Sequence, residues 1–350
     1  MKQYYTIVLL LFTHASGLTQ QDHLRKQIER LIQYETTIDY RITPGFIVGI
    51  LDGDSTYIRS FGQKDFNSNE SIRVNNVFEI GGISKVLTTI LTLQLLDSLD
   101  QNIHQSVNDL HYINPTFDSC KMVQLINHTS TLPKIPKGWG NLEENSRDPY
   151  AKLDSVIVDD FFTFHQYVSP PTCIYNYSHL NHVLLQRTLE QQYHQGYDQL
   201  ILSRLPPALQ GQWLDPTTVP GYSRARLKMD PWNTTAYKGS LGLHASLQDL
   251  IHLCRYFINL NEHQKQRFLA KFPCRIRKEK AFIGLSWQTL EIPKNRTIYV
   301  HLGHTDGHHA FIGFLPDTKT GAVILANSAI GSENLGVSIL SMVNDNWKRK

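Results

Sequence analysis

Residues 78–85 read Phe-Glu-Ile-Gly-Gly-Ile-Ser-Lys and run directly into an apolar stretch from Val86 to Leu96. This stretch predicts a buried helix from about residue 82 to residue 98. Its one cation, Lys85, stands where an unpaired ammonium would be costly to bury, so we expect it to face a cleft or a partner carboxylate. Gly82, three residues earlier, lies on the same helix face and has no side chain to place beside the amine.

On both sides of this helix the sequence alternates in the manner of β-strands. Residues 46–51 and 56–61, joined by the turn Asp52-Gly53-Asp54, predict a β-hairpin. Helices are predicted at residues 21–38 and 335–347, and further strands at residues 282–290, 297–301, 309–315 and 322–326. We therefore predict an α+β fold, in which residues 20–99 and 245–350 build one antiparallel sheet flanked by helices, and residues 100–244 form an inserted, mostly helical region.

Four segments, in this order along the chain, resemble segments of the serine β-lactamase and penicillin-binding superfamily. They are residues 44–62, 78–85, 125–133 and 239–250. The superfamily includes class C β-lactamases, D-alanyl-D-alanine carboxypeptidases and esterases. The resemblance covers almost the whole chain after residue 20, and it implies an active cleft between the sheet and the helical region.

Two motifs of that family are present with one functional residue changed in each. The family's Ser-x-x-Lys motif supplies a hydroxyl that attacks a carbonyl and a lysine that takes or relays the proton. Here Gly82 occupies the serine position, and Lys85 keeps the lysine. The family's Tyr-x-Asn motif resembles Tyr177-Ser178-His179, in which the tyrosine is kept and the amide that would hold substrate is an imidazole.

The third family motif is Lys or His, then any residue, then Gly, on the strand beside the cleft. We place it at His304-Thr305-Asp306, followed by Gly307, so that a carboxylate stands in the glycine position. Alternation along a strand would direct His304, Asp306 and His308 toward the cleft. A literal Lys319-Thr320-Gly321 follows Pro316-Asp317, and we predict that it is a turn.

No nearby hydroxyl is predicted to replace the missing serine. Ser84 lies about 100° around the helix from Lys85. Thr131 and Lys134 have suitable spacing, but Pro133 between them indicates a loop. By the resemblance, the backbone N–H groups of Gly82 and Gly307 would retain the family's oxyanion hole.

Three altered motifs favour a catalytically silent relative that binds a peptide, a cell-wall fragment or another carboxylate ligand. The resemblance makes Lys85, Tyr177 and His304 remnants of catalysis. It assigns to the ligand site the residues Gly82, His179, Asp306 and Gly307. An ion pair between Asp306 and Lys85 would fit both substitutions.

Two alternatives stay open. One is an active hydrolase that uses another nucleophile or a metal-activated water. Ligand types for such a metal are present at His301, His304, Asp306, His308 and His309. The other is a structural or interaction protein whose cleft is filled. We expect neither a cofactor nor a resident metal.

The composition limits the partners and the compartment. The net charge is +3 over 350 residues with dispersed lysines and arginines, which lacks the basic patch of a nucleic-acid-binding protein. Lys2, the apolar residues 7–12 and the small residues 15–17 predict a signal peptide over residues 1–19. We therefore expect a secreted or periplasmic protein without a stable membrane anchor. Disulfide pairing is left open among the four cysteines Cys120, Cys173, Cys254 and Cys274.

Overall fold

The computed structural model describes residues 26–27, 29–33, 41–136, 148, 150–276, 279–292, 295–331 and 333–346. The predicted signal peptide lies outside these ranges. So does most of the predicted helix at 21–38, of which residues 26–27 and 29–33 are described and helical. Within the described ranges, no helix is long and apolar enough to cross a membrane.

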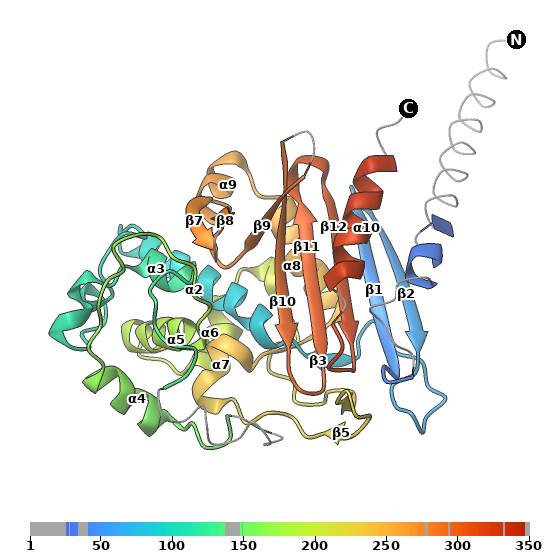
Figure 1. The fold of residues 1–350 in the computed structure, drawn as a ribbon, viewed down its shortest axis with the longest axis horizontal. Coiled ribbons are helices and arrows are strands. Elements are labelled where there is room, and N and C mark those ends of the chain that lie inside the picture. The colour runs from blue at the N-terminus through green and yellow to red at the C-terminus, as the bar shows by residue number, and fades with distance from the viewer. Residues whose placement is uncertain are drawn as a thin grey trace, which may run out of the picture.

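An eight-stranded antiparallel sheet organises the molecule (Figure 1), in the order β2-β1-β12-β11-β10-β9-β8-β7. Its strands are β1 Gly45–Asp52, β2 Ser55–Gly62, β7 Phe272–Ile276, β8 Glu279–Ile283, β9 Gln288–Ile292, β10 Arg296–His304, β11 His309–Leu315 and β12 Thr320–Ala326. Strand β1 pairs with β12 over seven register positions, so the sheet joins the two ends of the chain as predicted. The short strands form two further pairs, β3 Val77–Glu79 with β6 His244–Ser246, and β4 Gly221–Tyr222 with β5 Lys228–Met229.

Helices cover both faces of the sheet and fill the region beside it (Figure 1). They are α2 Ser84–Ser98, α3 Met122–Ile126, α4 Ser155–Phe164, α5 His179–Tyr193, α6 Tyr197–Arg204, α7 Lys238–Leu241, α8 Leu247–Ile258, α9 Glu262–Phe268 and α10 Glu333–Asn346. A short 3₁₀ helix, η1 Gly81–Ile83, leads directly into α2. The structure thus confirms the predicted α+β fold with helices between the strands of the two chain ends.

The central strands send alternate side chains into two apolar layers. On β1, Ile47 and Leu51 belong to the large core that includes α8. Phe46, Val48 and Ile50 belong to a second core that includes α10. Because both faces are covered, apolar residues succeed one another along these strands with little polar interruption.

One predicted strand is wrong. Residues 282–290 form the end of β8, a reversal, and the start of β9, because the chain turns between Gly284 and Trp287. Ser286 has a φ of 61°, in the left-handed region, and the N–H of Gly284 donates to the carbonyl of Trp287 at 2.8 Å. The apolar pattern hid this turn because Leu285 and Trp287 within it are core residues.

Candidate functional site

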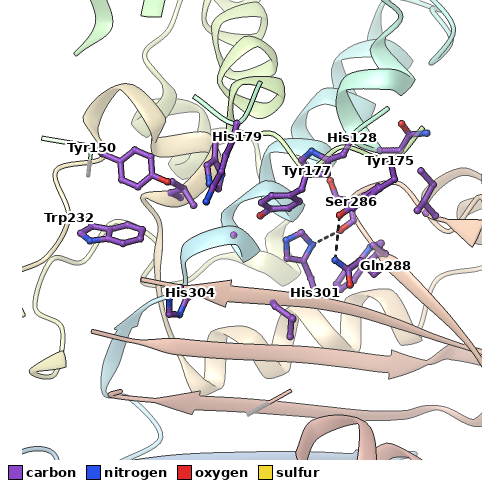
Figure 2. Close-up of a pocket in the computed structure, with 18 residues that line it drawn as sticks. His128, Tyr150, Tyr175, Tyr177, His179, Trp232, Ser286, Gln288, His301 and His304 are labelled. Carbon is purple, nitrogen blue, oxygen red and sulfur yellow. Dashed lines mark hydrogen bonds between the residues drawn. The ribbon is translucent and has the colours of Figure 1, made fainter. Parts of the chain in front are cut away.

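A pocket of about 350 Å³ opens between the helical region and the edge of the sheet (Figure 2). The helical region contributes His128, Tyr177 and His179 to its lining. The β8–β9 turn contributes Ser286, and β10 contributes His301. The pocket shows that side chains do not fill the cleft.

Gly82 lies at this pocket, in η1, with its backbone buried. A Cβ atom added to it would lie 2.7 Å from the carbonyl oxygen of Leu302 and 2.8 Å from the hydroxyl of Tyr177. It would also lie 3.4 Å from Nε2 of His301. The space that a serine side chain needs is therefore already occupied, in part by backbone that cannot rotate away.

Lys85 is fully buried on the first turn of α2, directly after Gly82's segment. Its amine donates to the carbonyl of Ser240 at 2.8 Å and to Nδ1 of His179 at 3.2 Å, and it lies 4.8 Å from the centre of the Tyr177 ring. Burial, and secondarily the charge of Lys134, hold the pKa of the amine well below its ordinary value. These contacts replace the ion pair with Asp306 that the sequence suggested, and the structure shows no such pair.

Tyr177 and His179 lie on either side of the N-terminus of α5 and meet Lys85. Their ring centres are 5.4 Å apart, and Tyr177 also contacts the ring of His128 at 4.5 Å. Burial raises the pKa of the Tyr177 hydroxyl, with Tyr175 and Tyr150 adding to the effect. Burial, then Lys85, lower the pKa of His179 well below its ordinary value, so this ring is neutral. The structure brings Gly82, Lys85, Tyr177 and His179 together.

The strand residue beside Gly82 is His301, whereas His304 lies exposed at the end of β10. Nδ1 of His301 donates to the carbonyl of Ser286, so its proton is on Nδ1 and Nε2 is the side turned toward Gly82. Burial first, then Lys85, lower the pKa of His301 to about 4, against the opposing effect of the Ser286 and Gly82 carbonyls. At neutral pH this imidazole is an uncharged base.

The third motif therefore begins three residues earlier than predicted, at His301 instead of His304. His301-Leu302-Gly303 has the family's His-x-Gly form, which His304-Thr305-Asp306 lacks, and it lies on the strand against Gly82. A Cβ on Gly303 would overlap the carbonyl oxygen of Ile80, so this close approach requires glycine. The glycine of the motif is thus kept, and Asp306 does not replace it.

Asp306, Gly307 and His308 do not face the cleft as strand alternation predicted, because β10 ends at His304 and residues 305–308 form the turn into β11. His308 is buried, and its two nitrogens donate to Glu79 and to the carbonyl of Val219, both at 2.9 Å. Gly307 packs against Gly221, and its carbonyl accepts from the N–H of Tyr222 at 3.0 Å. Neither Asp306 nor Gly307 lines the pocket, so the predicted pairing of Gly307 with Gly82 in an oxyanion hole is not supported.

The half-buried Asp306 carboxyl lies near the indole of Trp232. Burial has the largest effect on the pKa of this carboxyl and raises it. The indole of Trp232 lowers the pKa, and the charges of Glu79 and Asp148 raise it further. Trp232 and Tyr150, with ring centres 5.0 Å apart, form an aromatic wall of the pocket (Figure 2). Sequence reasoning missed both residues because neither stands in a motif. His128 was missed although it lies in the family-like segment 125–133.

The pocket is lined by one cationic side chain, Lys134, and by uncharged imidazoles such as those of His179 and His301. No Asp or Glu belongs to the lining within the part of the chain that the structure describes. Ser84, by contrast, is engaged elsewhere: its hydroxyl accepts from the N–H of Leu243 at 3.1 Å.

The metal alternative finds no support among the described residues, where no group of three His, Cys, Asp or Glu side chains could hold an ion. Instead, His301 is hydrogen-bonded to the carbonyl of Ser286, and His308 is hydrogen-bonded to Glu79. Of the literal Lys319-Thr320-Gly321, only Lys319 lies in a turn as predicted, with a φ of 53° after the 3₁₀ turn Pro316–Thr318, whereas Thr320 and Gly321 begin β12.

Solved structures share this architecture. A β-lactamase/D-alanine carboxypeptidase from Pseudomonas syringae is 18% identical, with 91% of this chain and 98% of that chain covered and a TM-score of 0.74. One from Yersinia pestis, complexed with citrate, is 19% identical, with coverages of 92% and 98% and a TM-score of 0.74. A class C β-lactamase in complex with cefoxitin is 17% identical, with coverages of 93% and 99% and a TM-score of 0.76. At these identities the likeness concerns the fold.

Comparison with curated protein sequences found no match. The family model described as Beta-lactamase matches residues 24–336. Since this match spans most of the sequence and the solved structures agree in fold, the chain belongs to the β-lactamase family.

Proposed function

We propose that this protein has lost the acyl-enzyme chemistry of its family and binds a carboxylate-bearing ligand in the pocket. The observation that supports the loss most strongly is the environment of Gly82. Gly82 itself carries no hydroxyl, and the Tyr177 hydroxyl and the Leu302 carbonyl occupy the space of a side chain. A nucleophile could not be restored by one substitution without moving β10 or the Tyr177 ring.

The ligand side of the proposal rests on charge and shape. The cation Lys134 borders a pocket in which no described lining residue is acidic, and the uncharged imidazole of His301 and the ring of His304 add polar nitrogens. Tyr150 and Trp232 add an aromatic wall that suits the apolar part of a ligand. A short peptide or a cell-wall fragment with a free carboxylate combines both features. The predicted signal peptide would deliver the protein to the compartment where such ligands occur.

Citrate is a suitable probe, because one related structure is complexed with it. Titration calorimetry should detect citrate binding to the purified protein. Lys134→Met should weaken it about two- to fivefold, the effect of losing one exposed ion pair. The control Lys228→Met removes the same charge from exposed β5 and should leave the affinity unchanged. An absence of citrate binding, or equal effects of the two substitutions, would contradict an anion site in this pocket.

A second candidate is hydrolysis with another hydroxyl as nucleophile. Ser286 lines the pocket in a left-handed conformation, and its Oγ lies 3.1 Å from Nε2 of His182. Burial and neighbouring basic groups hold the pKa of His182 well below its ordinary value, so this ring is neutral and able to accept a proton. However, the same Oγ also bonds to Thr89 in the interior of the helical region. A fluorophosphonate adduct mapped to Ser286 and lost in Ser286→Ala would favour this candidate.

A further inference from the structure

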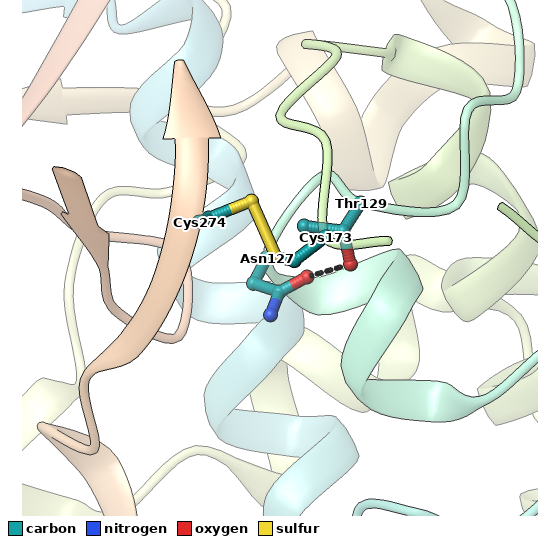
Figure 3. The surroundings of a disulfide bond; sticks show 4 residues. All are labelled: Asn127, Thr129, Cys173 and Cys274. Carbon is teal, nitrogen blue, oxygen red and sulfur yellow. Dashed lines mark hydrogen bonds between the residues drawn. A yellow bond between two sulfur atoms is a disulfide. The ribbon is translucent and has the colours of Figure 1, made fainter. Parts of the chain in front are cut away.

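The disulfide Cys173–Cys274, across 101 residues of sequence, joins the loop of one pocket wall to β7, whose partner strand β8 leads into the other wall. Cys173 lies in the loop that carries Tyr175 and Tyr177, which form the wall from the helical region. Cys274 lies in the middle of β7, at the edge of the sheet. Figure 3 shows the bond beside Asn127, another pocket residue, whose side-chain oxygen accepts from the Thr129 hydroxyl at 2.7 Å. The disulfide therefore lies directly next to the pocket.

The hairpin that carries Cys274 is weakly attached to the rest of the sheet. Strands β7 and β8 pair with each other at five register positions. Strand β8 pairs with β9 at a single position, Ile283 with Gln288. The turn that follows Ile283 is the sheet-side wall of the pocket. The position of this wall therefore depends on contacts other than the strand ladder.

Few polar contacts cross the pocket mouth between the same two walls. The amide of Gln288 donates to the hydroxyl of Tyr175 at 3.4 Å, near the limit for a hydrogen bond. Deeper in the site, His182 reaches Ser286 at 3.1 Å. Unlike these two hydrogen bonds, the disulfide is a covalent link. It connects the loop that carries one wall to the hairpin that leads into the other wall.

We propose that Cys173–Cys274 is a redox-sensitive clasp that sets the spacing of the two walls. Its reduction frees the β7–β8 hairpin and the Tyr175–Tyr177 loop from each other, and the pocket loosens. Ligand binding then weakens, and this consequence alone rests on the proposed function. The clasp itself is a property of the fold and can be tested without a ligand.

The chemistry requires a dithiol reductant. One thiolate of the reductant attacks the sulfur of the half-buried Cys173 and forms a mixed disulfide, while Cys274 leaves as a thiolate and takes up a proton. The second thiol of the reductant then displaces Cys173, so two electrons enter the protein and the reductant becomes a cyclic disulfide. Cys120 and Cys254 are free but buried. Burial raises the pKa of the Cys120 thiol to about 12 and also raises that of Cys254, so neither competes in the exchange.

Hydrogen–deuterium exchange on the full chain, before and after dithiothreitol, tests the clasp. Intact mass after alkylation should first show two newly accessible thiols. Exchange should then rise severalfold in peptides covering residues 173–178 and 279–288, while residues 45–52 and 320–326 of the central strands stay protected. The double variant Cys173→Ser with Cys274→Ser should reproduce this pattern without reductant, and the buried Cys120→Ser should not.

Two results would overturn the clasp. Unchanged exchange at both walls would show that the bond does not hold them, and a uniform rise that includes β1 and β12 would make it a general staple of the fold. Citrate titration of the oxidised and reduced forms separates the two proposals. If citrate binds neither form, the proposed ligand site fails, whereas the exchange pattern still decides the clasp.

Discussion

Among single residues, Gly82 has no room for a side chain in the structure as it stands. We expect Gly82→Ala to destabilise the protein by about 1–3 kcal/mol, because the new Cβ would press on the Leu302 carbonyl and the Tyr177 hydroxyl. The free energy of unfolding in urea measures the effect. The control is Gly196→Ala, where an added Cβ meets nothing within 4 Å. Equal stability of the Gly82 and Gly196 variants would show that the site has room for a side chain.

Lys85 should make the stability of the protein depend on pH. Burial lowers the pKa of its amine in the folded state, whereas the unfolded chain binds this proton below about pH 10.4. The unfolded state therefore binds more protons between the lowered pKa and that value, and stability rises with pH across this window. In urea unfolding at pH 7.5, 8.5 and 9.5, Lys85→Met should show a smaller rise than the native protein. Parallel curves would mean that Lys85 keeps its proton when folded.

At the scale of elements, hydrogen bonds to the Glu79 side chain connect β3 to the β10–β11 turn. Its carboxylate accepts from His308 and from the Thr305 hydroxyl, both at 2.9 Å, and from the N–H of Trp232 at 3.2 Å. These bonds keep the pKa of Glu79 lowered although burial alone would raise it. The stability that they contribute is present above the unfolded pKa of about 4.3 and is lost as the pH falls through the lower folded value.

Glu79→Gln should therefore cost about 1–3 kcal/mol at pH 7, since it removes a buried carboxylate that accepts hydrogen bonds from three groups. The difference from the native protein should shrink as the pH falls below about 4. Glu70→Gln serves as the control, because Glu70 pairs with Lys64 at the exposed surface and its loss should have a much smaller effect. If both substitutions have the same small effect at pH 7, the Glu79–His308 pair does not hold these elements together.

Some of these elements could be predicted from the sequence, and others could not. Strands β1, β11 and β12 were predictable because the runs at 46–51, 309–315 and 322–326 are apolar and bounded by turns. The β8–β9 turn was not, because Leu285 and Trp287 are core residues in a reversal. The third motif was misplaced because its position depends on the strand register, which the sequence alone does not show. Residues 304–307 carry a histidine and a glycine in sequence, but only the strand register brings His301 rather than His304 beside Gly82.

At the scale of the whole molecule, the sheet from both chain ends and the helical region meet at one pocket. Gly82, Lys85, Tyr177 and His179 were predicted and do converge there. The aromatic wall of Tyr150 and Trp232 could not be predicted, since it depends on how distant loops pack. Lys85 belongs to the helix, His301 to the sheet and Tyr177 to the loop before α5. The geometry of the site is thus a property of the assembled fold more than of one substitution.

The central claim is that this assembled site no longer forms an acyl-enzyme. The most direct measurement is the intact mass of the native protein after incubation with a fluorescent penicillin and, separately, a fluorophosphonate. A D-alanyl-D-alanine carboxypeptidase with the Ser-x-x-Lys serine, whose penicilloyl-enzyme is long-lived, serves as the positive control. The account predicts that the control gains one adduct with each reagent and that the native protein gains none. A stoichiometric adduct on the native protein, at any residue, would contradict it.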